Sequence, residues 1–147
     1  MPARSAGILL HRVRDGRRQV LIVHPGGPWW AGRDAGAWSI PKGEFLPPED
    51  PWTAARREFA EEIALPVPDG DVLDLGEVRL ASGKRVHAFA VDAELDLTGH
   101  RVAEVSNTFE LHGRRYPEID RAEWVDLDVA RVRLNAAQVP LLDRLGP

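Results

Sequence analysis

Three glutamates crowd one short stretch of a predicted helix near the middle of the chain. Glu58, Glu61 and Glu62 stand at i, i+3 and i+4, which places their carboxylates on one helix face. A like-charge i, i+4 pair costs about 0.2–0.5 kcal/mol in an isolated helix, and the helix macrodipole disfavours acids near a C-terminus. A sequence that accepts both costs indicates a binding site for a cation.

The acids need a rigid support, and the sequence around them predicts a helix that begins at Asp50 and Pro51. Aspartate is favoured at the N-cap and proline at the first helical position. Pro66 and Pro68 then end the helix, because proline cannot continue one. Between these limits the helix carries an apolar stripe, which consists of Trp52, Ala55, Phe59 and Ile63. The stripe predicts one buried face, with the acids on another.

The rest of the chain predicts a sheet that supports this helix. Apolar runs at residues 6–10 and 19–24 flank an Asp15-Gly16 turn, which indicates a hairpin covered on both faces. Further strands are expected over 72–80 (with a bulge at its glycine), 85–95, 106–111 and 119–125, a loop over 112–117, and a second helix within 128–145. Strands mixed with two helices predict an α/β fold, an α/β/α sandwich around a mixed β-sheet, in one domain over residues 1–147.

Composition narrows the class of protein. The chain has no cysteine, which excludes disulfides, thiolate catalysis and cysteine-type zinc sites. Its net charge is −4 and it has no basic stripe, so we expect no nucleic-acid polymer as a partner. No apolar run approaches the roughly 20 residues of a membrane span. We expect a cytoplasmic protein that acts on a small molecule; no feature of the sequence indicates its oligomeric state.

The stretch 43–65 resembles the signature of the Nudix hydrolases. That signature is a glycine, five residues, a glutamate, seven residues, Arg-Glu, an aliphatic or aromatic residue, any residue, Glu-Glu, any residue, a glycine and an aliphatic residue. Gly43, Glu49 and the run Arg57-Glu58-Phe59-Ala60-Glu61-Glu62 match it. Ala64 stands where the family has glycine, which usually ends the helix in the left-handed conformation. Alanine enters that conformation at a cost of about 1–2 kcal/mol, so we expect a modified helix exit with activity retained.

The resemblance implies hydrolysis of a phosphoanhydride bond with Mg²⁺ or Mn²⁺ as cofactor. Such cations prefer hard oxygen ligands and keep positions open for water and phosphate. The metal ligands that it implies are the Gly43 carbonyl and the carboxylates of Glu58, Glu61, Glu62 and Glu118. Glu118 lies six residues before Trp124, where some pyrophosphohydrolases of this family place a late metal-binding or base glutamate, and Glu110 is its rival.

The same resemblance suggests catalytic roles for Glu58, Arg57 and Glu61. Glu58 would bind metal or help to activate water, because the general base differs between subfamilies. Arg57 would orient the catalytic glutamate and can steady Glu61, which lies one helical turn later. Glu49 would be a supporting carboxylate behind the metal ligands, or an occasional ligand.

Substrate specificity is expected in the glycine- and proline-rich loop 25–40 and in the loop 112–117, because loops in compact domains are commonly functional. Lys42 either contacts a phosphate or is simply exposed. Trp29 and Trp30 either stack on a nucleobase, which contributes about 1–3 kcal/mol per base, or pack against the protein. For Trp38 we expect burial, because it lies next to Ile40 in the sequence.

The implied substrate is a nucleoside diphosphate linked to another group. The first interpretation is a MutT-like nucleoside triphosphate pyrophosphohydrolase acting on canonical or oxidised nucleotides. Alternatives are dinucleoside polyphosphates and, less attractive because of the low basic charge, diphosphoinositol polyphosphates. A different class of function is a catalytically silent domain that senses a nucleotide. The intact acids Glu58, Glu61 and Glu62 favour the enzyme.

Overall fold

The two apolar runs at the start of the chain form the centre of a mixed β-sheet in the computed structural model, which describes residues 3–146. β1 (Arg4–Arg14) and β2 (Arg17–Pro25) pair antiparallel. Asp15 and Gly16 join them, and both have positive φ. Two left-handed residues match the twist of a tight hairpin. The predicted hairpin is confirmed, and its central residues are buried.

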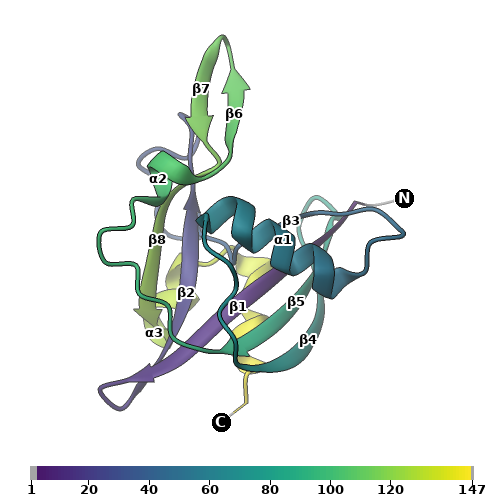
Figure 1. Cartoon of the computed structure of the whole chain (residues 1–147), viewed down its shortest axis with the longest axis vertical. Coiled ribbons are helices and arrows are strands. Elements are labelled where there is room, and N and C mark those ends of the chain that lie inside the picture. The colour runs from purple at the N-terminus through teal and green to yellow at the C-terminus, as the bar shows by residue number, and fades with distance from the viewer. Residues whose placement is uncertain (1–2, 147) are drawn as a thin grey trace.

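The remaining strands extend this hairpin on both sides. They are β3 (Lys42–Glu44), β4 (Asp71–Arg79), β5 (Arg85–Asp92) and β8 (Ile119–Asp126). The strand order is β4-β5-β1-β2-β8, with β3 beside β1 (Figure 1). β5 is parallel to β1 and the other pairs are antiparallel, so the sheet is mixed. The predicted bulge in β4 lies between Asp74 and Gly76, and β5 ends earlier than predicted.

Helices cover both faces of the sheet, as predicted for an α/β/α sandwich. They are α1 (Pro51–Ile63) on one face and, on the other, α3 (Leu127–Arg133), the 3₁₀ turn η1 (Ala136–Gln138) and α4 (Pro140–Asp143). Figure 1 shows α1 in front of the strands and the yellow C-terminal helices behind them. No helix within residues 3–146 is long and apolar enough to cross a membrane.

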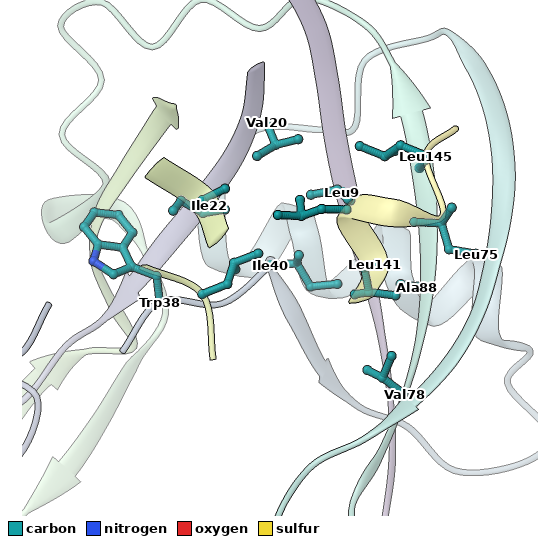
Figure 2. Packing of buried hydrophobic residues seen from close by; sticks show 14 of the residues in the cluster. Leu9, Val20, Ile22, Trp38, Ile40, Leu75, Val78, Ala88, Leu141 and Leu145 are labelled. Carbon is teal, nitrogen blue, oxygen red and sulfur yellow. The ribbon is translucent and has the colours of Figure 1, made fainter. Parts of the chain in front are cut away.

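Two hydrophobic cores result from the alternation of side chains along the central strands. Ile8 and Leu10 face α1, whereas Leu9 faces α4. Figure 2 shows the second core, in which Ile40 and Leu141 lie close to Leu9. All five side chains are fully buried, and burial of one aliphatic side chain contributes about 1.5–3 kcal/mol. One face of α1 is therefore buried against the sheet, and this contact holds the helix in place while its other face stays exposed.

The loop predicted over residues 112–117 is wrong. β6 (Thr108–Leu111) and β7 (Arg114–Pro117) form a separate antiparallel hairpin, and it projects from the body of the protein (Figure 1). His112 and Gly113 both have positive φ and supply a two-residue turn. The adjacent arginines have little strand preference by themselves, so pairing with β6 determines the structure.

The segment predicted to contain a second helix, residues 128–145, is helical in three short pieces, α3, η1 and α4. Leu134 is extended, which ends α3, and the Asn135 side chain accepts a hydrogen bond from the Ala137 amide to start η1. A short helix that the sequence did not predict, α2 (Val102–Val105), precedes β6.

α1 begins and ends with identifiable caps. The Asp50 carboxylate accepts hydrogen bonds from the Thr53 amide at 3.1 Å and the Thr53 hydroxyl at 2.7 Å, as expected of an N-cap. At the other end Ala64 has φ 62° and ψ 29°, and its amide donates to the Ala60 carbonyl. The predicted modification of the helix exit is therefore wrong, because alanine itself adopts the left-handed conformation.

The substitution Ala64→Gly should stabilise the protein by about 0.5–1 kcal/mol. Glycine removes the left-handed penalty of about 1–2 kcal/mol but gives the unfolded chain extra entropy, about 0.4–1 kcal/mol. Urea unfolding measures the difference. The matched control is Ala60→Gly, an exposed position inside the helix, which should lose about 1 kcal/mol. Equal losses at both positions would contradict the prediction.

Candidate active site

Carboxylates from two separate parts of the chain meet at the C-terminal end of α1. Glu58, Glu61 and Glu62 come from its last turns, and Glu118 is the residue between β7 and β8. Their charges act on one another, since Glu118 raises the pKa of both Glu58 and Glu62, and Glu61 raises the pKa of Glu118. Glu110 lies exposed on the projecting hairpin. The geometry therefore brings Glu118, and not Glu110, to the acids of the helix.

β3 brings main-chain groups to the same place. It pairs with β1, and its middle residue, Gly43, lies against the Glu58 carboxylate. A Cβ atom at this position would overlap the carboxylate, so only glycine allows so close an approach. The preceding residue, Lys42, donates its amide hydrogen to Glu62 Oε1 at 3.2 Å.

Arg57 links the glutamates of this region to one another. Its Nε and Nη2 donate to the two carboxylate oxygens of Glu49 at 2.9 and 2.8 Å. Its Nη1 donates to Glu58 Oε1 at 2.7 Å and lies 3.4 Å from Glu61 Oε1. A two-point pair between guanidinium and carboxylate fixes orientation as well as charge. Glu49 thereby holds Arg57 in the position from which it directs Glu58.

Burial and mutual repulsion shift the proton affinity of these acids. Glu62 is 9% exposed. Burial, with smaller contributions from Glu118 and Glu58, raises its pKa to about 8 although Lys42 opposes the shift. Burial also raises the pKa of Glu58 and lowers the pKa of Lys42. Each of these shifts shows that the protein has desolvated charge here.

Backbone hydrogen bonds fix the acids relative to one another. The Asn107 amide donates to the Glu61 carbonyl at 3.2 Å, and the Asn107 carbonyl accepts from the Glu118 amide at 2.7 Å. The Glu118 carbonyl in turn accepts from the Gly26 amide at 2.9 Å. A ring nitrogen of His100 lies 2.6 Å from the Ile63 carbonyl, one of the unpaired groups of a helix end. Sequence reasoning missed Asn107 and His100, because neither belongs to a recognisable motif.

The donor set fits a hard divalent cation. Carboxylate oxygens and the main-chain carbonyl of Gly43 are the ligand types that Mg²⁺ and Mn²⁺ prefer. Within residues 3–146 no three acidic or histidine side chains are already arranged to hold a metal ion. Arg57 and the Lys42 amide instead occupy oxygens of Glu58 and Glu62. A cation would compete with these two donors and would neutralise the repulsion among the acids.

Two cavities border the acids, and both are lined in part by Pro25, Trp30, Glu62 and Glu118. The first cavity, about 260 Å³, also includes Lys42, Trp38, Asn135 and Gln138. The second cavity, about 320 Å³, lies under the projecting hairpin and also includes Gly27, Trp29, Phe109 and Leu111.

The cavities place the three predicted substrate contacts, Lys42, Trp29 and Trp30, beside the acids. Lys42 lines the first cavity, Trp29 the second, and Trp30 both. Trp29 is 66% exposed, whereas Trp38 is fully buried, as expected from its sequence neighbours. Two of the polar residues of the first cavity, Asn135 and Gln138, lie in the C-terminal segment that the sequence predicted only as helix.

The sequence matches the model of the NUDIX domain over residues 1–145. No curated protein matches it. Solved structures with the same fold include a Caenorhabditis elegans Ap4A hydrolase binary complex, at 21% identity and a TM-score of 0.63, covering 97% of this chain and 94% of that one. The NUDIX domain of Shewanella oneidensis NrtR complexed with ADP ribose has 16% identity and a TM-score of 0.63, with coverage of 99% and 90%. A Nudix hydrolase from M. smegmatis, RenU, has 23% identity and a TM-score of 0.55, with coverage of 96% and 82%.

The metal-free protein should lose stability as the pH rises from about 4.5 to about 8. The pKa of Glu62 is about 8 in the native state, against 4.5 for an ordinary glutamate. Between these values the native state retains a proton that the unfolded chain has released, so the free energy of unfolding falls with pH. Urea unfolding in a chelator, near pH 5 and near pH 8, measures this slope.

The substitution Glu62→Gln should make that slope shallower, by up to a few kcal/mol across the range. Glu104→Gln, at an exposed glutamate, is the matched control and should leave the slope unchanged. The same slope in Glu62→Gln as in the unmodified protein would show that Glu62 is not the buried titrating group.

Proposed function

The chain belongs to the NUDIX family, whose hydrolases act on phosphorus-containing acid anhydrides, and from this premise we propose that it cleaves a nucleoside diphosphate linked to another group. The observation that carries the proposal is the meeting of Glu58, Glu61, Glu62 and Glu118 beside two aromatic cavities, with Gly43 against the Glu58 carboxylate. A polyphosphate chain would match the acids once a cation is bound, and a planar base would match the aromatic cavities.

The acids and the Gly43 carbonyl would hold Mg²⁺ or Mn²⁺. A divalent cation supplies neutralisation of charge on the phosphate oxygens and favours attack by water. Arg57 would keep the Glu58 carboxylate in one orientation, because Glu49 occupies its other two donors at 2.8 and 2.9 Å. Glu58 would then bind the cation or accept a proton from the attacking water, and Glu61 lies near the same guanidinium nitrogen.

Lys42 and Trp30 would bind the substrate in the first cavity. The Lys42 ammonium is largely desolvated and lines this cavity together with Glu62. A phosphate oxygen would offset that desolvation, as an opposite charge stabilises a buried cation. The indole of Trp30 offers a face on which a nucleobase can stack, a contact that contributes about 1–3 kcal/mol. Trp29, which lines the second cavity, would do the same there.

Nucleoside triphosphates, canonical or oxidised, are the first substrates that we propose. Dinucleoside polyphosphates are the second candidate, and a specific observation favours them: the second cavity borders the same two acids, Glu62 and Glu118, as the first. The similar C. elegans protein is an Ap4A hydrolase. Diphosphoinositol polyphosphates fit less well, because Lys42 is the one basic side chain described in the lining of either cavity.

A nucleotide-sensing domain without activity is the alternative from another class. The Shewanella NrtR domain, complexed with ADP ribose, shows that this fold can hold such a ligand. The presence of Glu58, Glu61 and Glu62 argues for the enzyme. These carboxylates repel one another, and a domain that only binds a ligand has no need of that unfavourable arrangement.

A substrate panel tests the proposal directly. Purified protein with Mg²⁺ or Mn²⁺ should release phosphate, pyrophosphate or a nucleotide from nucleoside triphosphates, dinucleoside polyphosphates or nucleoside diphosphate sugars. Mass spectrometry of the products formed in ¹⁸O-labelled water identifies the phosphorus attacked. Binding of a nucleotide without any product from the whole panel would support the sensing domain instead.

The substitution Glu58→Gln should lower kcat by about 10²–10⁴-fold, because the amide keeps the shape but loses the charge and the basicity of the carboxylate. Circular dichroism should show an unchanged fold. Glu110→Gln, on the projecting hairpin away from the acids, should leave kcat within about twofold of the unmodified protein. A near-normal rate in Glu58→Gln would refute the role proposed for Glu58.

A further inference from the structure

His24 is a buried histidine outside the group of residues proposed to act on the substrate. It is the last residue but one of β2, it is 1% exposed, and its ring lies edge-on to the Trp38 indole with the ring centres 5.2 Å apart. Both ring nitrogens have an oxygen within hydrogen-bond distance. Nδ1 lies 2.8 Å from Asp120 Oδ1, and Nε2 lies 2.7 Å from the Arg33 carbonyl oxygen. The ring therefore joins β8 to the segment that follows β2.

A β-bulge aims Asp120 at this ring. The register between β2 and β8 shifts between His24 and Pro25, which leaves Asp120 as an extra residue without a partner across the strand pair. Neighbouring side chains of a regular strand point to opposite faces, and Arg121 lies over Trp38 on the side of the sheet that His24 faces. The extra residue of a bulge re-aims a side chain, so Asp120 reaches the same side. Asp120 thereby fixes the orientation of the His24 ring.

The other oxygen belongs to the turn that carries Trp29 and Trp30. Arg33 holds this turn together, since its amide donates to the Trp30 carbonyl at 3.0 Å and its Nε donates to the Trp29 carbonyl at 2.7 Å. Its guanidinium also lies over the Trp29 ring, 4.3 Å from the ring centre. A displacement of the Arg33 main chain would therefore displace both tryptophans.

The turn has few other connections to the body of the protein. Among the residues that the structure describes, the bond between His24 and the Arg33 carbonyl is the one hydrogen bond that joins residues 27–33 to the rest of the chain. The next residue, Asp34, accepts a hydrogen bond from the Trp38 indole at 2.8 Å, but through its side chain. The main chain of the turn is thus held directly by His24.

We propose that His24 is a positioning residue for substrate binding, which holds the Arg33 main chain through Nε2 and so keeps Trp29 and Trp30 at the cavities beside the acids. The role of the tryptophans rests on the proposed function, whereas the link from His24 to Arg33 is a property of the free protein. A carbonyl oxygen only accepts a hydrogen bond, so the link requires a hydrogen on Nε2. Its loss should weaken substrate binding and leave the hydrolytic step unchanged.

Two substitutions of His24 separate its two hydrogen bonds. The amide nitrogen of glutamine can occupy the position of Nε2, and the amide nitrogen of asparagine that of Nδ1. His24→Gln should therefore retain the bond to Arg33, whereas His24→Asn should retain the bond to Asp120 and lose the one to Arg33. His87→Asn is the matched control, because His87 is likewise paired with an aspartate, Asp74 at 2.8 Å, but lies on β5.

Hydrogen–deuterium exchange followed by mass spectrometry measures the link without any nucleotide. Peptides that cover residues 29–36 should exchange about three- to tenfold faster in His24→Asn than in the unmodified protein, the size expected from the loss of one hydrogen bond. His24→Gln and His87→Asn should exchange at the unmodified rate. Equal rates in His24→Asn and His24→Gln would overturn the proposal.

Steady-state kinetics with Mg²⁺ measure the consequence for binding, with ATP, diadenosine tetraphosphate and ADP-ribose as the substrates. For each one that the protein hydrolyses, KM should rise about three- to tenfold in His24→Asn while kcat stays within about twofold. KM should stay near its unmodified value in His24→Gln and His87→Asn. A fall in kcat with an unchanged KM in His24→Asn would overturn the positioning role.

NMR of the unmodified protein tests the link without any substitution, and it decides the case if His24→Asn fails to fold. A ¹⁵N-resolved spectrum should show a slowly exchanging proton on Nε2 of His24, and an Nε2 without a proton would overturn the proposal. Absence of hydrolysis across the panel, with this proton and the exchange difference present, would remove the enzymatic function and support the link. Hydrolysis with equal exchange in both His24 variants would retain the function and overturn the link.

Discussion

Repulsion among the carboxylates at the end of α1 is the constraint on which the rest of the structure depends. Several groups limit its cost before any cation is present: Arg57 pairs with Glu58, and the Lys42 amide donates to Glu62. His100 and Asn107 bind carbonyls of the last helical turn, where the macrodipole is negative. Arg57 donates to one oxygen of Glu58 and the Lys42 amide donates to one oxygen of Glu62, so neither donor takes up the whole carboxylate.

The sandwich architecture follows from the need to keep this helix end still and accessible. Ala55, Phe59 and Ile63 pack α1 onto the sheet, so the opposite side of the helix is free to carry charge. The pairing of β2 with β8 brings Gly26 and Glu118 to the same edge, where they are hydrogen bonded. Groups from distant parts of the sequence therefore meet without needing a long ordered loop of their own.

The parts of the site that depend on local spacing could be predicted from the sequence. Helical periodicity places Glu58, Glu61 and Glu62 together, and the central hairpin and the buried stripe follow from local patterns as well. The parts of the site that depend on contacts between distant residues could not be predicted in this way. β7 forms only because β6 pairs with it, and Asn107 acts through its main chain, which any residue type can supply. Ala64 shows the same limit, since it adopts the left-handed conformation that alanine disfavours.

One hydrogen-bonded pair, the Asn107 carbonyl and the Glu118 amide, has a consequence for how this protein can diversify. The residues between them, 108–117, form the hairpin that projects from the body of the protein and ends beside the place where it begins (Figure 1). Changes of length or sequence in the β6–β7 hairpin need not disturb the acids or the sheet, because a longer loop costs little in folding free energy. The sequence and length of the hairpin can thus change while the groups that hold the acids together stay as they are.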